Sequence, residues 1–127
     1  MKTKLLYFLP FLFIFTSCYK QERNCANFRT GKFEFVAEIN GEKKVSTFIR
    51  TDSLEIETFE GKTDTATIRW VNDCEFILQK INPKTMADKK AVSMKIVTTD
   101  GDTAVFEYGY TTDARRERGT IKKTADL

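Results

Sequence analysis

The sequence contains no histidine, and it has only six glycines, three cysteines and two prolines among its 127 residues. Without histidine, the chain lacks the commonest general base and the commonest zinc ligand. No glycine-rich phosphate-binding loop occurs, and a serine or threonine nucleophile would need a lysine or an N-terminal amine as its base. We therefore expect no enzymatic activity, no catalytic residues, no cofactor and no metal site.

The first eighteen residues have the organisation of a bacterial export signal. Two lysines precede an apolar stretch, residues 5–15, and the small residues Thr16 and Ser17 stand directly before Cys18. This arrangement resembles the lipobox of bacterial lipoproteins, although Phe15 stands where that motif usually has leucine. The resemblance predicts removal of residues 1–17, lipidation of Cys18 and a membrane-anchored protein of the cell envelope, held at the outer membrane.

An ordinary signal peptide and an uncleaved membrane anchor are the alternatives for this segment. Residues 5–15 are too short for the anchor, because a helix needs roughly 20 apolar residues to span a bilayer. Two acyl chains, in contrast, anchor a small domain stably.

Removal of the signal would leave 110 residues, enough for one domain with a modest core. Two of the 21 basic residues would be lost with it, so that 19 basic residues remain against 18 acidic ones and the net charge is +1. A nearly neutral domain has no general attraction to nucleic acid. We expect no nucleic-acid partner.

With Cys18 assigned to lipid, Cys25 and Cys74 remain as an even pair in a chain sent to an oxidising compartment. We predict one disulfide between them, and two free thiols are the alternative. The polar residues 18–29 are expected to be the lipidated cysteine and its tether, and residues 30–127 are expected to form a single domain.

Apolar and polar residues alternate with a period of two from Gly31 onward, which predicts strands with one buried face. The expected strands cover residues 32–39, 43–50, 53–59, 65–71, 74–81, 91–99, 103–112 and 119–123, the last as a short edge strand. Asn40-Gly41 is a strong hairpin signal, and residues 83–90 and 113–118 are expected to be loops.

Seven or eight strands with short connections predict an all-β fold, an antiparallel meander that closes into a barrel or a strongly curved sheet. A barrel is favoured because closure removes exposed edges, and a two-sheet sandwich is the alternative. Glu55 and Glu57 are expected on the solvated face. The expected inward row consists of Phe33, Phe35, Leu54, Ile56, Ile68, Trp70, Leu78, Met94, Ile96, Phe106 and Tyr108.

Five residues are candidates for a ligand site. The aromatic residues Phe35, Trp70, Phe106 and Tyr108 would line an apolar cavity in a small barrel, unless they fill a solid core. Arg50 stands near an acidic strand, where it would pair with a carboxylate and orient an anionic ligand or close a barrel end. The basic segment 115–118 is expected to be a solvated loop.

Four segments, residues 28–33, 50–57, 70–75 and 80–83, resemble small lipoproteins of the Bacteroidota, and the resemblance covers nearly the whole mature chain. It implies a lipidated envelope protein with a β-rich, lipocalin-like fold, and no activity transfers with it. The label "DNA topoisomerase IV" that such lipoproteins sometimes carry finds no support in a domain of 110 residues without a nucleotide site. We expect a non-enzymatic binding or structural module for a small apolar ligand, and an inhibitor or adaptor of another envelope protein is the alternative.

Overall fold

The structure, a computed structural model, describes residues 23–127. The expected signal peptide, Cys18 and the start of the tether lie outside the described residues. A short 3-10 helix, η1 (Cys25–Phe28), precedes eight strands. These are β1 (Gly31–Ile39), β2 (Glu42–Arg50), β3 (Leu54–Phe59), β4 (Lys62–Asn72), β5 (Glu75–Lys80), β6 (Val92–Asp100), β7 (Thr103–Tyr110) and β8 (Glu117–Ala125).

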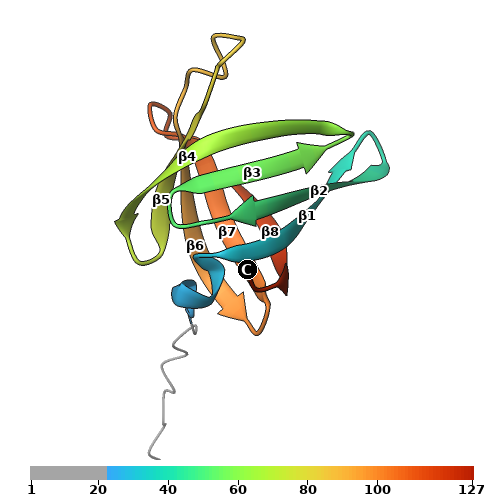
Figure 1. Cartoon of the computed structure of the whole chain (residues 1–127), viewed down its shortest axis with the longest axis vertical. Helices are drawn as coiled ribbons and strands as arrows, with labels where there is room; N and C mark the ends of the chain where they lie inside the picture. The colour runs from blue at the N-terminus through green and yellow to red at the C-terminus, as the bar shows by residue number, and fades with distance from the viewer. Residues whose placement is uncertain (1–22) are drawn as a thin grey trace, which may run out of the picture.

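Each strand pairs antiparallel with the next, and β8 pairs with β1, so the sheet closes into a barrel (Figure 1). The all-β prediction and the preference for a barrel are confirmed. The expectation of an edge strand at residues 119–123 is wrong, because β8 is hydrogen-bonded on both sides. Phe35 of β1 and Ala104 of β7 both pair with Ile121 in the middle of β8.

Tight turns connect the long hairpins. Asn40 and Gly41 have φ angles of 53° and 77°, and Glu60 and Gly61 have φ angles of 49° and 77°. Two consecutive residues with positive φ form the type I′ turn, whose twist matches that of paired strands. Asn40-Gly41 was recognisable from the sequence, whereas at the second turn a glutamate takes the left-handed conformation.

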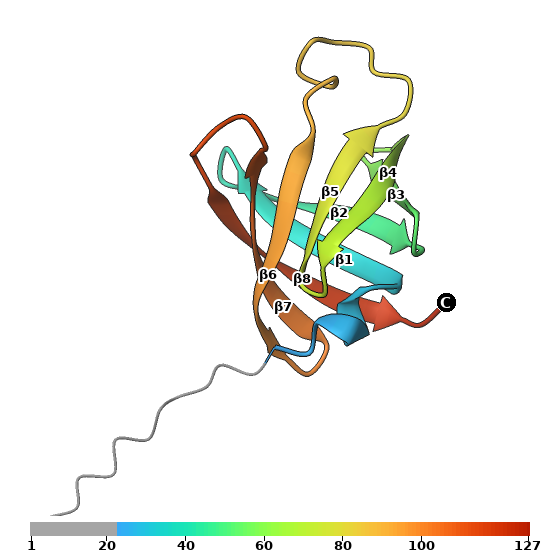
Figure 2. The same ribbon diagram turned by 90° about the vertical axis from the view of Figure 1, so that its left-hand side faces the viewer.

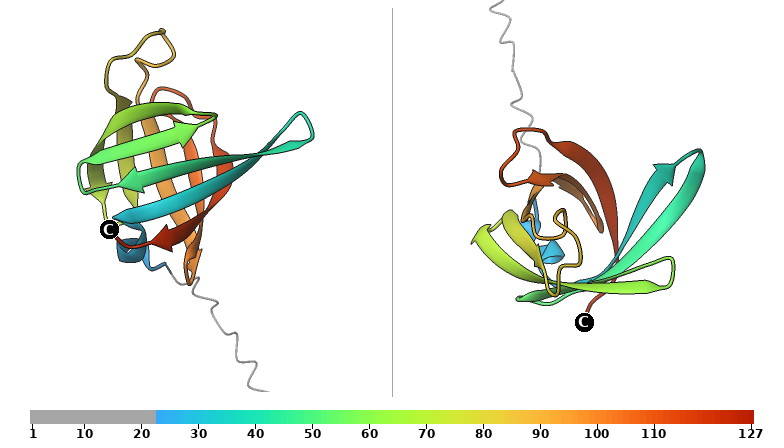
Figure 3. Two further views of the ribbon diagram at one scale, coloured as in Figure 1. Left: turned by 45° about the vertical axis from the view of Figure 1, so that its right-hand side comes forward. Right: turned by 90° about the horizontal axis from the view of Figure 1, so that it is seen from above.

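The β1–β2 hairpin is longer than its contacts with the rest of the barrel. Pairing of β1 with β8 covers Lys32–Phe35, and pairing of β2 with β3 covers Thr47–Arg50. The distal part of the hairpin therefore projects beyond the barrel wall (Figure 3). Its cross-strand partners Val36 and Val45 are both about half exposed.

One end of the barrel is sealed by η1 (Figure 2). Phe28 of η1 is completely buried, and Cys25 forms a disulfide with Cys74, which joins η1 to the turn between β4 and β5. The predicted disulfide is confirmed. Because the two cysteines are 49 residues apart, loop-closure entropy gives a stabilisation of about 4 kcal/mol. The core beneath consists of Cys25, Phe28, Phe33, Phe48, Ile96, Ala104, Phe106 and Ile121.

The predicted phase of β3 is wrong. Glu55 faces the interior and is 8% exposed, whereas Leu54 and Ile56 lie on the outer face. Directly paired residues share a face of a sheet, and Glu55 pairs with Arg50, which is only 1% exposed. Burial of this arginine places the acidic side of β3 inside the barrel.

Candidate ligand-binding cup

A buried pair of opposite charges, Arg50 and Glu55, lies at the centre of the seal. The Nε and Nη2 atoms of Arg50 donate hydrogen bonds to Oε1 of Glu55 at 3.2 and 3.0 Å, and Nη1 donates to the carbonyl oxygen of Phe28 at 2.7 Å. Charge-assisted hydrogen bonds of this kind are the strong ones in proteins. Arg50 therefore fastens η1 to β2 and β3, which closes this end of the barrel.

Aromatic rings surround the same guanidinium group. The carbon Cζ of Arg50 lies 4.5 Å from the ring centre of Phe76, 4.9 Å from Phe33 and 5.2 Å from Phe48. Burial in this cage lowers the pKa of Arg50, and the negative charge of Glu55 opposes that change. The arginine and its carboxylate partner satisfy each other within the seal.

The barrel is hollow above this seal. An inner cavity of about 190 Å³ lies on the aromatic floor, and a second cavity of about 220 Å³ continues toward the open end. Both are lined by Glu55, Glu57 and Leu78, and together we call them the cup. The inner cavity is also lined by Phe35, Phe48, Met94, Phe106 and Tyr108, and the outer one by Asp64, Thr65, Ala66, Lys80, Ala87, Asp88, Lys90, Val92 and Tyr110.

The segment between β5 and β6, residues 81–91, lies at the mouth of the cup and forms the loop at the top of Figure 1. Lys80 Nζ is 3.2 Å from Oδ1 of Asp88, and Gln79 Nε2 donates a hydrogen bond of 2.8 Å to the carbonyl of Lys89. The hydrogen bond raises the pKa of Lys80 and lowers the pKa of Asp88. These contacts fix the loop to the end of β5.

Aromatic side chains form the apolar wall of the cup. The rings of Phe35 and Phe106 meet edge to face with centroids 5.7 Å apart, and Phe106 lies 5.4 Å from Tyr108. Gly119 makes room for them, because a Cβ atom there would lie 2.7 Å from the Phe35 ring and 2.8 Å from the Phe106 ring. Burial, followed by the hydrogen bond with Glu117, raises the pKa of Tyr108.

The opposite wall is acidic. Glu57 pairs with Phe48 of the core on one side and with Asp64 on the other, so its side chain points into the cup. Burial raises the pKa of Glu57, the charges of Glu55 and Asp64 raise it further, and Lys80 opposes them. Solvent still reaches this carboxylate through the mouth.

The hydroxyl of Ser46 is a second polar group beside Glu57. Ser46 is 6% exposed, and its Oγ makes no hydrogen bond of ordinary length within residues 23–127. A longer hydrogen bond from this hydroxyl to Glu57 opposes the rise in the pKa of that carboxyl. The cup thus contains a carboxylate without an ion-pair partner in the described part of the chain, and the buried hydroxyl of Ser46 lies beside it.

The sequence candidates are only partly brought together. Phe35, Phe106 and Tyr108 line the inner cavity, and Phe106 also belongs to the buried core. Trp70 lies away from the cup, with its ring 4.7 Å from Phe76 and 4.7 Å from the guanidinium carbon of Arg29. Arg50 lies below the cup, in the seal.

Glu55 and Glu57 are the site residues that alternation alone placed on the wrong face. The one signal for them in the sequence was Arg50, since a buried arginine needs a carboxylate on a neighbouring strand. The expected inward positions of Leu54 and Ile56 conflicted with that requirement.

The basic segment near the C-terminus is engaged by its own surroundings. Arg118 donates two hydrogen bonds to Oε1 of Glu107, at 3.1 and 2.8 Å, and Arg115 pairs with Glu117 at 3.3 Å. Arg116 donates to three backbone carbonyl groups of the 110–115 turn. Arg115 and Arg116 belong to an exposed loop, as expected, whereas Arg118 lies in β8, so the loop ends before Glu117 and the predicted bounds are wrong.

Within residues 23–127, no helix is long and apolar enough to cross a membrane. No three side chains of the metal-ligating types converge in that part of the chain. A scan against protein-family models found no match, and neither did a search of curated proteins. The chemistry of the cup is therefore argued from its own lining: an aromatic wall, an acidic wall and a sealed floor.

Proposed function

We propose that this protein is a non-enzymatic binding module that holds a small ligand in the cup. A barrel with one sealed end and one hollow end supports this proposal best, because small barrels that bind ligands do so in their interior. The apolar body of the ligand would lie against Phe35, Leu78, Met94 and Phe106. The loop at residues 81–91 would cover it.

A filled cup provides the test. Ala66→Trp places an indole in the outer cavity, between the inner cavity and the mouth, whereas Arg69→Trp places one on the outer face of the same strand. Native mass spectrometry of the full-length protein, purified from its own cells, is expected to show a small molecule with the wild type and with Arg69→Trp but not with Ala66→Trp. Wild-type protein free of any small molecule would contradict the proposal.

We also propose that the domain is exported and held at the cell envelope by lipid on Cys18. The disulfide supports this, because such bonds persist in oxidising compartments. The described chain starts at the sealed end (Figure 2), so a lipid attached there would leave the mouth of the cup facing away from the membrane. Metabolic labelling with a fatty acid should mark the wild type and not Cys18→Ser; equal labelling would contradict the anchor.

An inhibitor or adaptor of another envelope protein is the alternative function. The projecting part of the β1–β2 hairpin favours it, since Val36 and Val45 are an exposed apolar pair next to strand edges without partners in the barrel. The same mass spectra distinguish the two functions. A protein partner that is retained by Ala66→Trp and lost from a Val36→Lys, Val45→Lys double variant would favour the alternative.

A further inference from the structure

We infer that the ligand of the cup is a small organic cation, an apolar body with a protonated amine that faces Glu57; this inference rests on the proposed binding function and names its ligand class. Four observations of the cup lead to it: the inward carboxylate, the balance of charge, the buried hydroxyl and the aromatic wall.

The carboxylate of Glu57 is not explained by the fold. Glu55, two residues earlier on the same face, is neutralised by Arg50 at 3.0 Å. Glu57 makes no ion pair within 4 Å in the described part of the chain. The charged form of a carboxylate that is partly shielded from water and has no ion-pair partner is disfavoured by the fold, whereas a glutamine or an apolar residue at this position would avoid that cost.

Together with Arg50, the side chains that line the cup carry a net charge of −1. The pairing of Glu55 with Arg50 removes both of these residues from the balance. Three acidic side chains, Glu57, Asp64 and Asp88, then remain against two lysines.

Both lysines are already engaged. Lys80 lies between Asp88, at 3.2 Å, and Asp64, at 3.8 Å. Lys90 lies 5.1 Å from the ring centre of Tyr110 at the mouth. The uncompensated charge is therefore that of Glu57, at the junction of the inner and outer cavities.

Ser46 offers a second oxygen beside this carboxylate. Its hydroxyl is buried and has no hydrogen-bond partner of ordinary length in the described chain, which is uncommon for a buried polar group. An ammonium group has three N–H donors and no acceptor. It would donate to the Glu57 carboxylate and to Ser46 Oγ at the same time.

The aromatic wall suits the same ligand. Phe35, Phe106 and Tyr108 present apolar surface and electron-rich ring faces, which attract cations as well as hydrocarbon. A neutral apolar ligand would strip water from Glu57 without replacing it, and an anion would meet the charges of Glu57 and Asp64. The lining thus discriminates by charge.

Three probes of nearly equal size separate the possibilities: 2-phenylethylamine, 2-phenylethanol and 3-phenylpropionate. Dissociation constants for the full-length protein in a nonionic detergent can be measured by ligand-observed NMR at neutral pH. We expect the amine to bind about fivefold tighter than the alcohol, as for a partly solvated ion pair, and the acid to bind most weakly.

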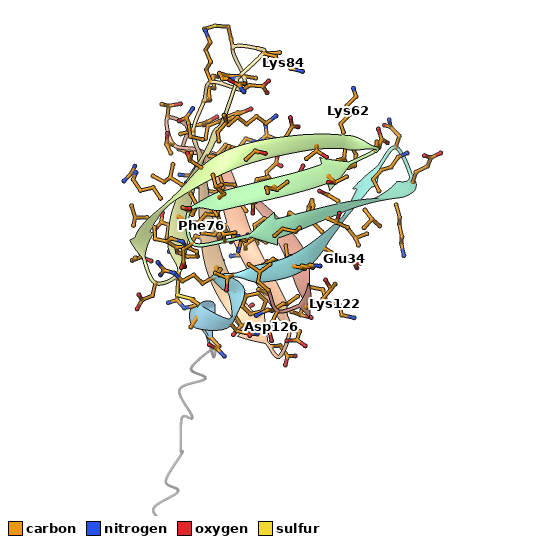
Figure 4. The ribbon with its side chains drawn as sticks, in the orientation of Figure 1. Glu34, Lys62, Phe76, Lys84, Lys122 and Asp126 are labelled. Carbon is orange, nitrogen blue, oxygen red and sulfur yellow. A yellow bond between two sulfur atoms is a disulfide. The ribbon has the colours of Figure 1, made fainter. Side chains whose placement is uncertain are left out.

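The matched variants remove one negative charge from inside or outside the barrel. Glu57→Gln should abolish the preference for the amine and leave the alcohol unaffected, and Asp64→Asn should reduce the preference. Glu34→Gln, on the exposed outer surface (Figure 4), should change neither. Binding of the alcohol by Glu57→Gln also shows that this variant is folded.

Two results would overturn the inference in different ways. Equal affinity of the wild type for amine and alcohol, or a preference that survives in Glu57→Gln, would reject the organic cation and leave the binding function standing. Failure of all three probes to bind would reject the binding function as well.

Discussion

The two ends of the barrel use the same pair of strands in opposite ways. At the sealed end, Glu55 of β3 meets Arg50 of β2, and a carbonyl group of η1 completes the hydrogen bonds of the arginine. Two residues further along β3, Glu57 stands opposite Phe48 and forms no ion pair within residues 23–127. One inward carboxylate therefore fastens the structure, and the next one is the group that we propose to contact a ligand.

The segments that cover the two ends also differ in how firmly they are held. Helix η1 is cross-linked by a disulfide and buries Phe28 completely. The loop at the mouth is held by hydrogen bonds of the exposed residues Gln79 and Lys80. Segments with few buried apolar contacts open locally at little cost in free energy. The mouth is thus the end at which a ligand can enter.

The largest expected effect comes from breaking the seal at Glu55. Glu55→Ala leaves Arg50 buried without its counter-charge, and removal of one partner from a buried pair typically costs about 3–5 kcal/mol. The free energy of unfolding, measured in denaturant with the disulfide intact, should fall by at least about 3 kcal/mol.

Two variants bracket this result. Asp52→Ala removes the partner of Arg29 from an exposed pair of 3.0 Å and should cost less than about 1 kcal/mol. Arg50→Met together with Glu55→Leu should recover most of the loss, because apolar residues of similar size replace buried ion pairs well. A loss below about 1 kcal/mol for Glu55→Ala would remove the distinction between the two carboxylates.

The second effect concerns the boundary between the two ends. Gly119→Val would push a branched side chain against the rings of Phe35 and Phe106, and overpacking of this kind costs about 1–3 kcal/mol. Thr120→Val, on the exposed outer face of the same strand, should change the free energy of unfolding by less than about 0.5 kcal/mol. If the two substitutions lowered the melting temperature equally, the aromatic rings would be able to move and make room for the added side chain.

The strand pattern and the Asn40-Gly41 turn could be predicted from the sequence, but the phase of β3 could not. Alternation defines two faces without saying which one is inside, and the more apolar face of β3 was the natural choice. The structure makes the opposite choice because Arg50 lies in the core and its cross-strand position is occupied by Glu55. This pairing depends on the register between neighbouring strands. The periodicity of a single strand does not determine that register.

The cup itself was only half predictable. Phe35, Phe106 and Tyr108 were recognised as wall residues because they share the inward phase of their strands. Trp70 has the same phase but lies too far along β4, a displacement that depends on strand tilt in the closed barrel. The covering loop has no periodicity from which its position could be inferred.

The smallest expected effect is the pH-dependent change in stability caused by Glu57. Because burial and the nearby charges of Glu55 and Asp64 raise the pKa of Glu57, the folded protein holds this proton more tightly than the unfolded chain does. The carboxylate therefore costs stability as the pH rises, and this cost is absent below the ordinary pKa of glutamate, about 4.3, and fully present above the raised pKa. Glu57→Gln should raise the melting temperature slightly at neutral pH, and the gain should vanish in acid.

Glu34→Gln, which removes the same charge from the outer face opposite Lys122, should show no gain at either pH. A residue whose removal adds stability while it abolishes ligand discrimination is maintained for the ligand, since selection tolerates such a cost at binding sites. If Glu57→Gln instead lowered the melting temperature at neutral pH, Glu57 would be a second structural carboxylate like Glu55. Both ends of the barrel would then use an inward carboxylate to stabilise the fold.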